Sequence, residues 1–152
     1  MEELLSVIAL VISVISGLFA TYTFFWTARR DRQQATLEAY NQLQEQALDH
    51  LNYYMPAAIK EIAQNPRSEE YKKISSYVAR IEHFCVGVNQ KIYDKKTVYE
   101  LAQDYLDGAI KDRIEPIIEK KNRHTNEDYY ENIHKVYKWM AEQKAKEEGK
   151  GK

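Results

Sequence analysis

The feature that most constrains this chain is an unbroken apolar run near its start, from Leu4 to Trp26, with no charged residue and no proline. At about 1.5 Å of rise per residue, a helix of this length covers the roughly 30 Å hydrocarbon core of a bilayer. The run follows an acidic start and ends in bulky aromatic residues, whereas a secretory signal peptide has a basic start and a small-residue cleavage site. We therefore expect an uncleaved transmembrane helix over residues 1–28.

The flanks of this run predict its orientation. Arg29, Arg30 and Arg32 follow the run, and no basic residue precedes it. Cytoplasmic flanks are rich in Lys and Arg, so we expect the N-terminus outside and the C-terminal domain in the cytoplasm. Tyr22 and Trp26, with Arg29 and Arg30, are the expected membrane-interface residues, because aromatic rings favour that depth.

A stripe of small and hydroxylated residues runs along the apolar segment at alternating steps of three and four. We call this stripe the seam; it consists of Ser6, Ala9, Ser13, Ser16, Ala20, Thr23 and Thr27. Small residues let membrane helices approach closely and hydroxyls can bond across them, so the seam favours self-association. With the seam turned inward in several copies, the hydroxyls could line a narrow pore. Tight packing without a pore uses the same residues, and Ser or Thr can also bond back to its own helix.

The rest of the chain predicts an all-α architecture: a transmembrane helix that continues into a small cytoplasmic helical bundle over residues 29–143, followed by a disordered polar tail over residues 144–152. No breaker separates the apolar run from Pro56, so one helix should continue to that region. Ser68 is the expected cap of the next helix, and a loop is expected over residues 122–128. The apolar face of the helix after Ser68 is predicted from Ile74, Tyr77, Val78, Ile81, Phe84, Cys85 and Val88.

Composition and spacing offer little for catalysis. The formal net charge is −1, which predicts no bulk affinity for nucleic acid. Glu131 and His134 have the spacing of a helical di-iron ligand pair, but such sites use the motif twice. The single cysteine, Cys85, lies on an apolar helix face, where cysteine is usually a small hydrophobe. We expect no enzyme activity, no metal site and no cofactor.

Tyrosines interleaved with lysines and arginines are the main candidates for ligand binding. Aromatic rings stack on bases and basic groups contact phosphates, as a nucleotide or a short single-stranded DNA requires. Lys73, Tyr77 and Arg80 share one helix face by their spacing and are the predicted ligand-binding residues. The alternative is that the tyrosines are core-edge residues and the lysines are solvated surface.

The layout resembles a family of short bacterial single-span membrane proteins with a cytoplasmic helical domain of unknown function. The resemblance spans nearly the whole chain and rests on the segments TARRDRQQATLEAYNQL, SYVARIEHFCVGVNQKIYDKKTVYELAQDYL and YYENIHKVYKWM. It implies location in a bacterial inner membrane. Some proteins of this layout are membrane effectors of anti-phage operons beside a nucleotidyltransferase-like gene. The layout is also similar to the Hailong type, in which the effector is an oligomeric ion channel controlled by a DNA oligomer.

Together these features lead to two competing expectations. The first is a homo-oligomer, for instance a tetramer, that forms an ion channel or pore gated by a nucleotide or oligonucleotide at its cytoplasmic domain, with a nucleotidyltransferase as operon partner. Its opening would depolarise the membrane in anti-phage defence. The second is a membrane-tethered helical adaptor that docks a cytoplasmic partner protein. Replacing residues 1–28 by an unrelated anchor would preserve the function of an adaptor and abolish that of a channel.

Overall fold

The computed structural model describes residues 1–125 and 128–150. Within these ranges every regular element is helical and no β-strand occurs, which confirms the expected all-α class. The remaining residues, 126–127 and 151–152, lie outside the described residues; they include part of the expected 122–128 loop and the end of the expected tail.

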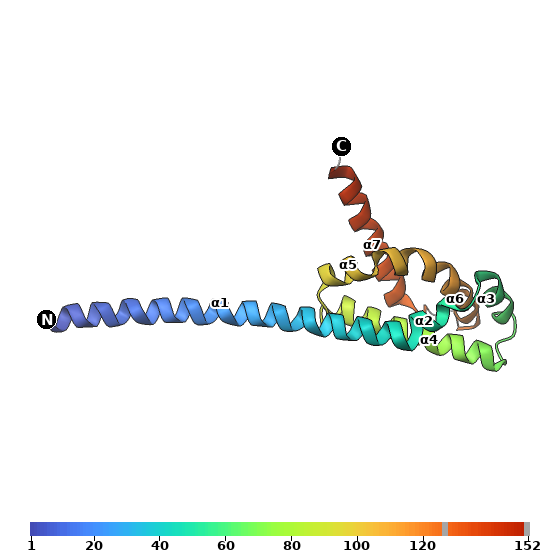
Figure 1. The fold of residues 1–152 in the computed structure, drawn as a ribbon, viewed down its shortest axis with the longest axis horizontal. Coiled ribbons are helices and arrows are strands. Elements are labelled where there is room, and N and C mark those ends of the chain that lie inside the picture. Colours follow the sequence, from blue (N-terminus) through green and yellow to red (C-terminus); the bar gives the residue numbers. More distant parts are fainter. Residues whose placement is uncertain (126–127, 151–152) are drawn as a thin grey trace.

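The first helix is long and mostly unpartnered. Helix α1 (Glu2–Leu43) passes into a π-helical turn, η1 (Gln44–Leu48), and then into α2 (Asp49–Asn52) without a break. This confirms the single helix expected to end near Pro56. Its N-terminal half projects away from the bundle (Figure 1), and none of its most apolar window, of mean hydropathy 2.5, is buried. By length and composition this helix can cross a membrane.

The remaining helices form a bundle at the other end of α1 (Figure 1). Helix α4 is central, since it packs on α1, η1, α6 and α7, and α3 covers α6. Apolar side chains from all these helices bury one another in a single core. The bounds of the helices are α3 (Pro56–Ile62), α4 (Glu69–Asn89), α5 (Lys95–Asp104), the π-helical turn η2 (Tyr105–Ile110), α6 (Lys111–Thr125) and α7 (Glu131–Lys150).

Local sequence signals explain several of these boundaries. The Ser68 hydroxyl accepts a hydrogen bond from the backbone N–H of Tyr71 at 3.1 Å, which confirms Ser68 as the cap of α4. Asp94 caps α5 in the same way, through the backbone N–H of Thr97 at 2.9 Å. The predicted apolar face of α4 is buried throughout. A regular amphipathic pattern after a good N-cap was therefore sufficient to predict this helix.

The start of α7 is held by a neighbouring helix rather than by its own residues. The Glu82 carboxylate of α4 accepts hydrogen bonds from the backbone N–H groups of Asn132 at 3.2 Å and Ile133 at 2.9 Å. A carboxylate at this position satisfies N–H groups that have no partner within the helix and complements the helix dipole. This contact ties α7 to α4 at the end of the bundle where α7 begins.

Other expectations differ from the structure. The helix expected to continue to Pro56 contains a π-helical turn, η1, which includes the fully buried residues Ala47 and Leu48. Helix α7 continues through residues 144–150, which were expected to belong to a disordered tail.

Candidate functional site

The seam lies on the projecting half of α1, and the chain itself buries none of its residues. Thr23 donates its hydroxyl to the backbone carbonyl oxygens of Phe19 at 3.0 Å and Ala20 at 2.9 Å. Thr21, beside the seam, donates to the carbonyl of Gly17 at 2.8 Å. These hydroxyl groups therefore donate to backbone carbonyl oxygens of their own helix. Their oxygen atoms can still accept a hydrogen bond from a neighbouring helix or from water.

The seam and the bundle lie on opposite faces of the same helix. At about 100° per residue, Thr36, Tyr40 and Leu43 lie about 180° around α1 from Thr27, give or take about 40°. Burial agrees with this geometry, since Thr36 is 0%, Tyr40 7% and Leu43 5% exposed. The bundle therefore does not cover the seam.

The seam face continues beyond the apolar segment as an exposed polar face. Gln34, Glu38 and Asn41 lie within about 40° of the Thr27 direction. All three are exposed, and the Gln34 amide donates to the Glu38 carboxylate at 3.0 Å. This face of α1 is therefore free of the bundle from the apolar segment to Asn41.

The expected interface residues surround the end of the apolar run. Tyr22 and Trp26 are 67% and 56% exposed, and Arg29 and Arg30 are exposed as well. The Arg30 guanidinium lies over the Trp26 ring, 5.9 Å from its centroid. A cation beside an amphipathic ring is a suitable arrangement for the headgroup layer.

The structure does not bring the three predicted ligand-binding residues together. Tyr77 is only 7% exposed and its ring stacks on His50 with centroids 5.2 Å apart, so it belongs to the core. Lys73 lines a shallow hollow between the start of α4 and Tyr54. Arg80 instead donates a hydrogen bond to Gln46 of η1. Helical spacing placed the three on one side of α4, but that side is divided between the core and two separate hollows.

Arg80 belongs to a groove between α1 and α4 that the sequence analysis did not find. The groove has a volume of about 550 Å³ and contains Arg80 and His83 with the rings of Phe84 and Tyr93. Those two rings stack with centroids 5.2 Å apart. Among the described residues that line the groove, none is acidic. Its volume and chemistry suit a small anionic ligand that has a flat ring.

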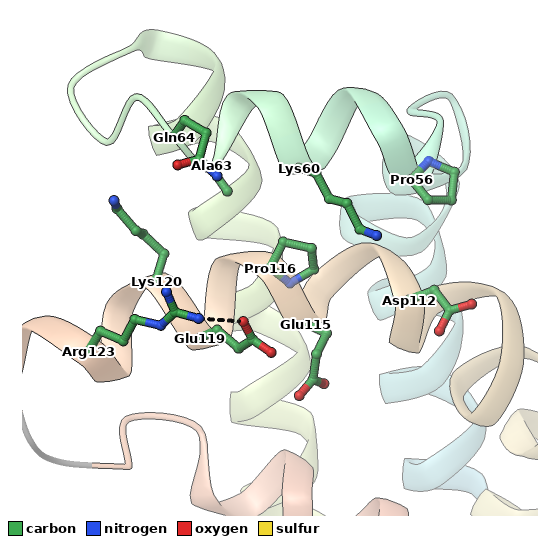
Figure 2. Close-up of a pocket in the computed structure, with 10 residues that line it drawn as sticks. All are labelled: Pro56, Lys60, Ala63, Gln64, Asp112, Glu115, Pro116, Glu119, Lys120 and Arg123. Carbon is green, nitrogen blue, oxygen red and sulfur yellow. Dashed lines mark hydrogen bonds and ion pairs between the residues drawn. The ribbon is translucent and has the colours of Figure 1, made fainter.

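A second pocket, between α3 and α6, has mixed charge (Figure 2). Its volume is about 670 Å³, and Pro116, which lies inside α6, forms part of its wall. The Glu119 carboxylate pairs with the Arg123 guanidinium at 3.2 Å, a contact drawn in the close-up. Three basic and three acidic side chains line it, so the pocket favours neither sign of ligand. Its charged residues are Lys60, Lys120, Arg123, Asp112, Glu115 and Glu119.

The residues considered for metal binding or nucleophilic chemistry have other partners. His134 contacts Asp128 at 3.0 Å, and Glu131 pairs with Lys135 at 2.6 Å. Across the part of the chain that the structure describes, no group of three potential metal-binding side chains is found. Burial raises the pKa of the Cys85 thiol well above its usual value, so the thiol remains protonated at neutral pH.

Comparison with known proteins places the chain in a family. Residues 9–140 match the family described as a domain of unknown function, DUF4760, and the chain belongs to it. The match begins inside the apolar run, so the family domain includes most of the projecting half of α1 as well as the bundle. No curated protein and no solved structure matches the chain.

Proposed function

We propose that this protein is a homo-oligomeric, single-span inner-membrane effector that forms an ion channel or pore controlled from its cytoplasmic bundle. Copies of α1 would meet along the seam, with their bundles on the outside of the assembly. Opening would let ions cross and depolarise the membrane. A role in anti-phage defence, and a nucleotidyltransferase that makes the ligand, remain predictions from the resemblance.

One observation carries this proposal: a single continuous helix joins the seam to the core, and the two lie on opposite faces. A packed helix is stiff, so a shift of its buried face within the bundle would move the seam at the other end. A passive tether would need no such continuity. The family match, which covers both halves of α1, agrees with their acting as one unit.

The groove between α1 and α4 is the proposed site of control. A ligand there would touch both the long helix and its main partner in the bundle. It would bias the helix only if it binds one arrangement of α1 better than the other. The proposed ligand is a nucleotide or a short single-stranded DNA, with phosphate near Arg80 and a base against the Tyr93 ring.

Ion flux from liposomes that contain the full-length protein tests the channel directly. The double variant Ser13→Leu with Ser16→Leu fills the seam and should abolish flux while the protein stays in the membrane. Val11→Leu with Val14→Leu is the matched control, because these residues lie on the opposite face of the same turns and should leave flux intact. An intact oligomer without flux in any ligand state would refute the channel.

A second candidate function, the membrane-tethered adaptor, is favoured by one feature of the bundle. Tyr53 and Met55 are 86% and 76% exposed at the turn between α2 and α3, at the end of the bundle far from the projecting half of α1 (Figure 1). Exposed large apolar side chains of this kind often contact a partner protein.

A flexible insertion separates the two candidates. Four glycines placed between Gln33 and Gln34 would uncouple the seam from the bundle without removing either. The channel proposal predicts loss of ligand control over flux. An adaptor would still bind its partner at the membrane, and a Tyr53→Ser variant would then lose that binding. Ligand control that survives the insertion would count against coupling through α1.

A further inference from the structure

The turn between α4 and α5, residues 90–94, is the part of the bundle nearest to the projecting half of α1 (Figure 1). Lys91 adopts a positive φ of 62° there, and Ile92 is 56% exposed. The backbone N–H groups of Ile92 and Tyr93 donate to the Gly87 carbonyl at 2.9 and 3.3 Å. The turn is thus a defined structure that exposes a large apolar side chain beside a basic one.

The turn is attached directly to α1. The backbone N–H of Asp94 donates to the Thr36 hydroxyl at 2.8 Å, and that hydroxyl donates to the Arg32 carbonyl at 2.7 Å. Thr36 is fully buried, so water does not compete for these bonds. The position of α1 in a bilayer would therefore set the distance between this turn and the membrane.

That distance is short if α1 spans the bilayer as proposed above, and the inference rests on that placement. Thr36 follows Thr27 by nine residues, or about 14 Å along a helix. A headgroup layer takes up roughly 5–8 Å of it. The turn would then stand within about 10 Å of the membrane surface, close to the Debye length at physiological salt.

Positive charge collects between this turn and the end of the apolar run. Arg29 and Arg32 lie on the bundle side of α1, within about 40° of the Thr36 direction, rather than on the seam side. Burial alone would raise the pKa of Asp94, but its hydrogen bonds from Thr97 and the nearby Arg29 and Arg32 outweigh burial and leave that pKa below its usual value. Both arginines precede Thr36 by one or two turns on the same face, so they lie on the side of α1 to which the turn is bonded.

The turn also contains one carboxylate, that of Asp94, which remains ionised and offsets part of this charge. Asp94 accepts bonds from the backbone N–H and the hydroxyl of Thr97, both at 2.9 Å, as the cap of α5. Lys91 and Arg29 add positive charge on the membrane side of the turn. This combination of basic groups with an exposed aliphatic side chain is typical of proteins that contact anionic lipid surfaces.

We propose that Arg29, Arg32, Lys91 and Ile92 form a surface that binds the headgroups of anionic phospholipids in the leaflet next to the bundle. Lipid phosphates would contact the basic groups while Ile92 enters the outer part of the interface. Because the turn is hydrogen-bonded to Thr36, lipid binding would restrict rotation of α1 about its own axis. It would therefore also fix the direction in which the seam faces.

Lipid-dependent quenching on the full-length chain tests this surface. A Cys85→Ala background removes the native thiol, and Ile92→Cys carries an apolar fluorophore in its place. The protein is inserted into vesicles of phosphatidylcholine, alone or mixed with phosphatidylglycerol, that contain lipids with a quencher near the headgroup. We expect stronger quenching with phosphatidylglycerol, lost at high salt. A label at Tyr53→Cys, on the far end of the bundle, should be unquenched in both.

A charge variant sharpens the test. Lys91→Gln should lower the equilibrium constant for lipid contact about fivefold, which is the effect expected of one basic residue near an anionic surface. Lys60→Gln, on α3 away from the turn, should change nothing. Two results would refute the lipid-binding surface but not the membrane-spanning helix. One is equal quenching in both lipid mixtures, and the other is no quenching in a chain that floats with the vesicles. A chain that does not float with the vesicles would overturn both.

Discussion

The two halves of α1 have the same secondary structure and opposite relations to the rest of the chain. Between residues 4 and 27 the helix is apolar and the chain buries no residue on it. From Thr36 onwards the helix is mostly polar, yet one face of it belongs to the core. The apolar half thus depends on something outside the monomer, a bilayer or other copies, while the polar half is stabilised by its own bundle.

The largest expected contrast comes from removing one leucine from the apolar half of α1 and another from η1, which continues α1 within the bundle. Leu48→Ala empties a fully buried position and should destabilise the bundle by about 2–5 kcal/mol, because a cavity remains. Leu10 is 66% exposed, so Leu10→Ala should leave bundle stability unchanged. Thermal unfolding in detergent, followed by circular dichroism, compares the two. A similar loss from Leu10→Ala would mean that the projecting half packs on the chain after all.

A smaller contrast is expected for two threonines that both donate to their own helix. Thr36→Val also removes the acceptor of the Asp94 N–H and should cost about 1–3 kcal/mol, because a buried donor loses its partner. Thr23→Val should change bundle stability by less than about 0.5 kcal/mol. Urea unfolding measures both values, and faster hydrogen exchange at Asp94 in Thr36→Val would identify the lost bond. Equal stability of the two variants would contradict the role given to Thr36.

Alkaline pH should lower the stability of the bundle. Near pH 10, where this loss begins, the effect should be smaller than that of either substitution above. Burial raises the pKa of Tyr130 to about 12, whereas an unfolded tyrosine ionises near pH 10. The resulting stability is complete below about pH 10 and is lost as the pH rises towards about 12. Unfolding measured from pH 9 to 11 should show the decline begin. Tyr130→Phe should reduce it, and Tyr129→Phe, at an exposed residue, should not.

The smallest effect on bundle stability is expected from filling the seam. Ser13→Leu with Ser16→Leu should leave the unfolding of the bundle unchanged, since no bundle residue contacts that face. Self-association in the membrane should weaken, because bulky residues keep the backbones apart. Energy transfer between labelled copies in vesicles measures the association. A less stable bundle together with unchanged self-association would mean that the seam packs on the bundle and not on other copies.

Much of the fold followed from local signals. The unbroken helix to the Pro56 region, the Ser68 cap and the buried face of α4 were all predictable, since each depends on residues within a few turns of one another. The π-helical turns were not, because the apolar spacing at η1 fits an ordinary α-helix equally well. The helical end of the chain was also missed, as its polar composition resembles a solvated tail.

The candidate site was less predictable than the fold. Spacing grouped Lys73, Tyr77 and Arg80, although Tyr77 stacks on His50 from another helix. The groove with Arg80 and His83 exists only where α4 meets α1, and nothing in the neighbouring sequence marks it. Long-range packing decides such sites, so a single sequence carries little information about them.

The apolar half of α1 and its small-residue seam can be recognised from the amino-acid sequence alone, because composition and helical period are properties of consecutive residues. The direction in which the seam faces depends on packing. The bundle packs on Thr36, Tyr40 and Leu43, and helix geometry then directs the seam to the opposite side. That direction follows from contacts between residues far apart in the chain, and it leaves the seam open to another copy.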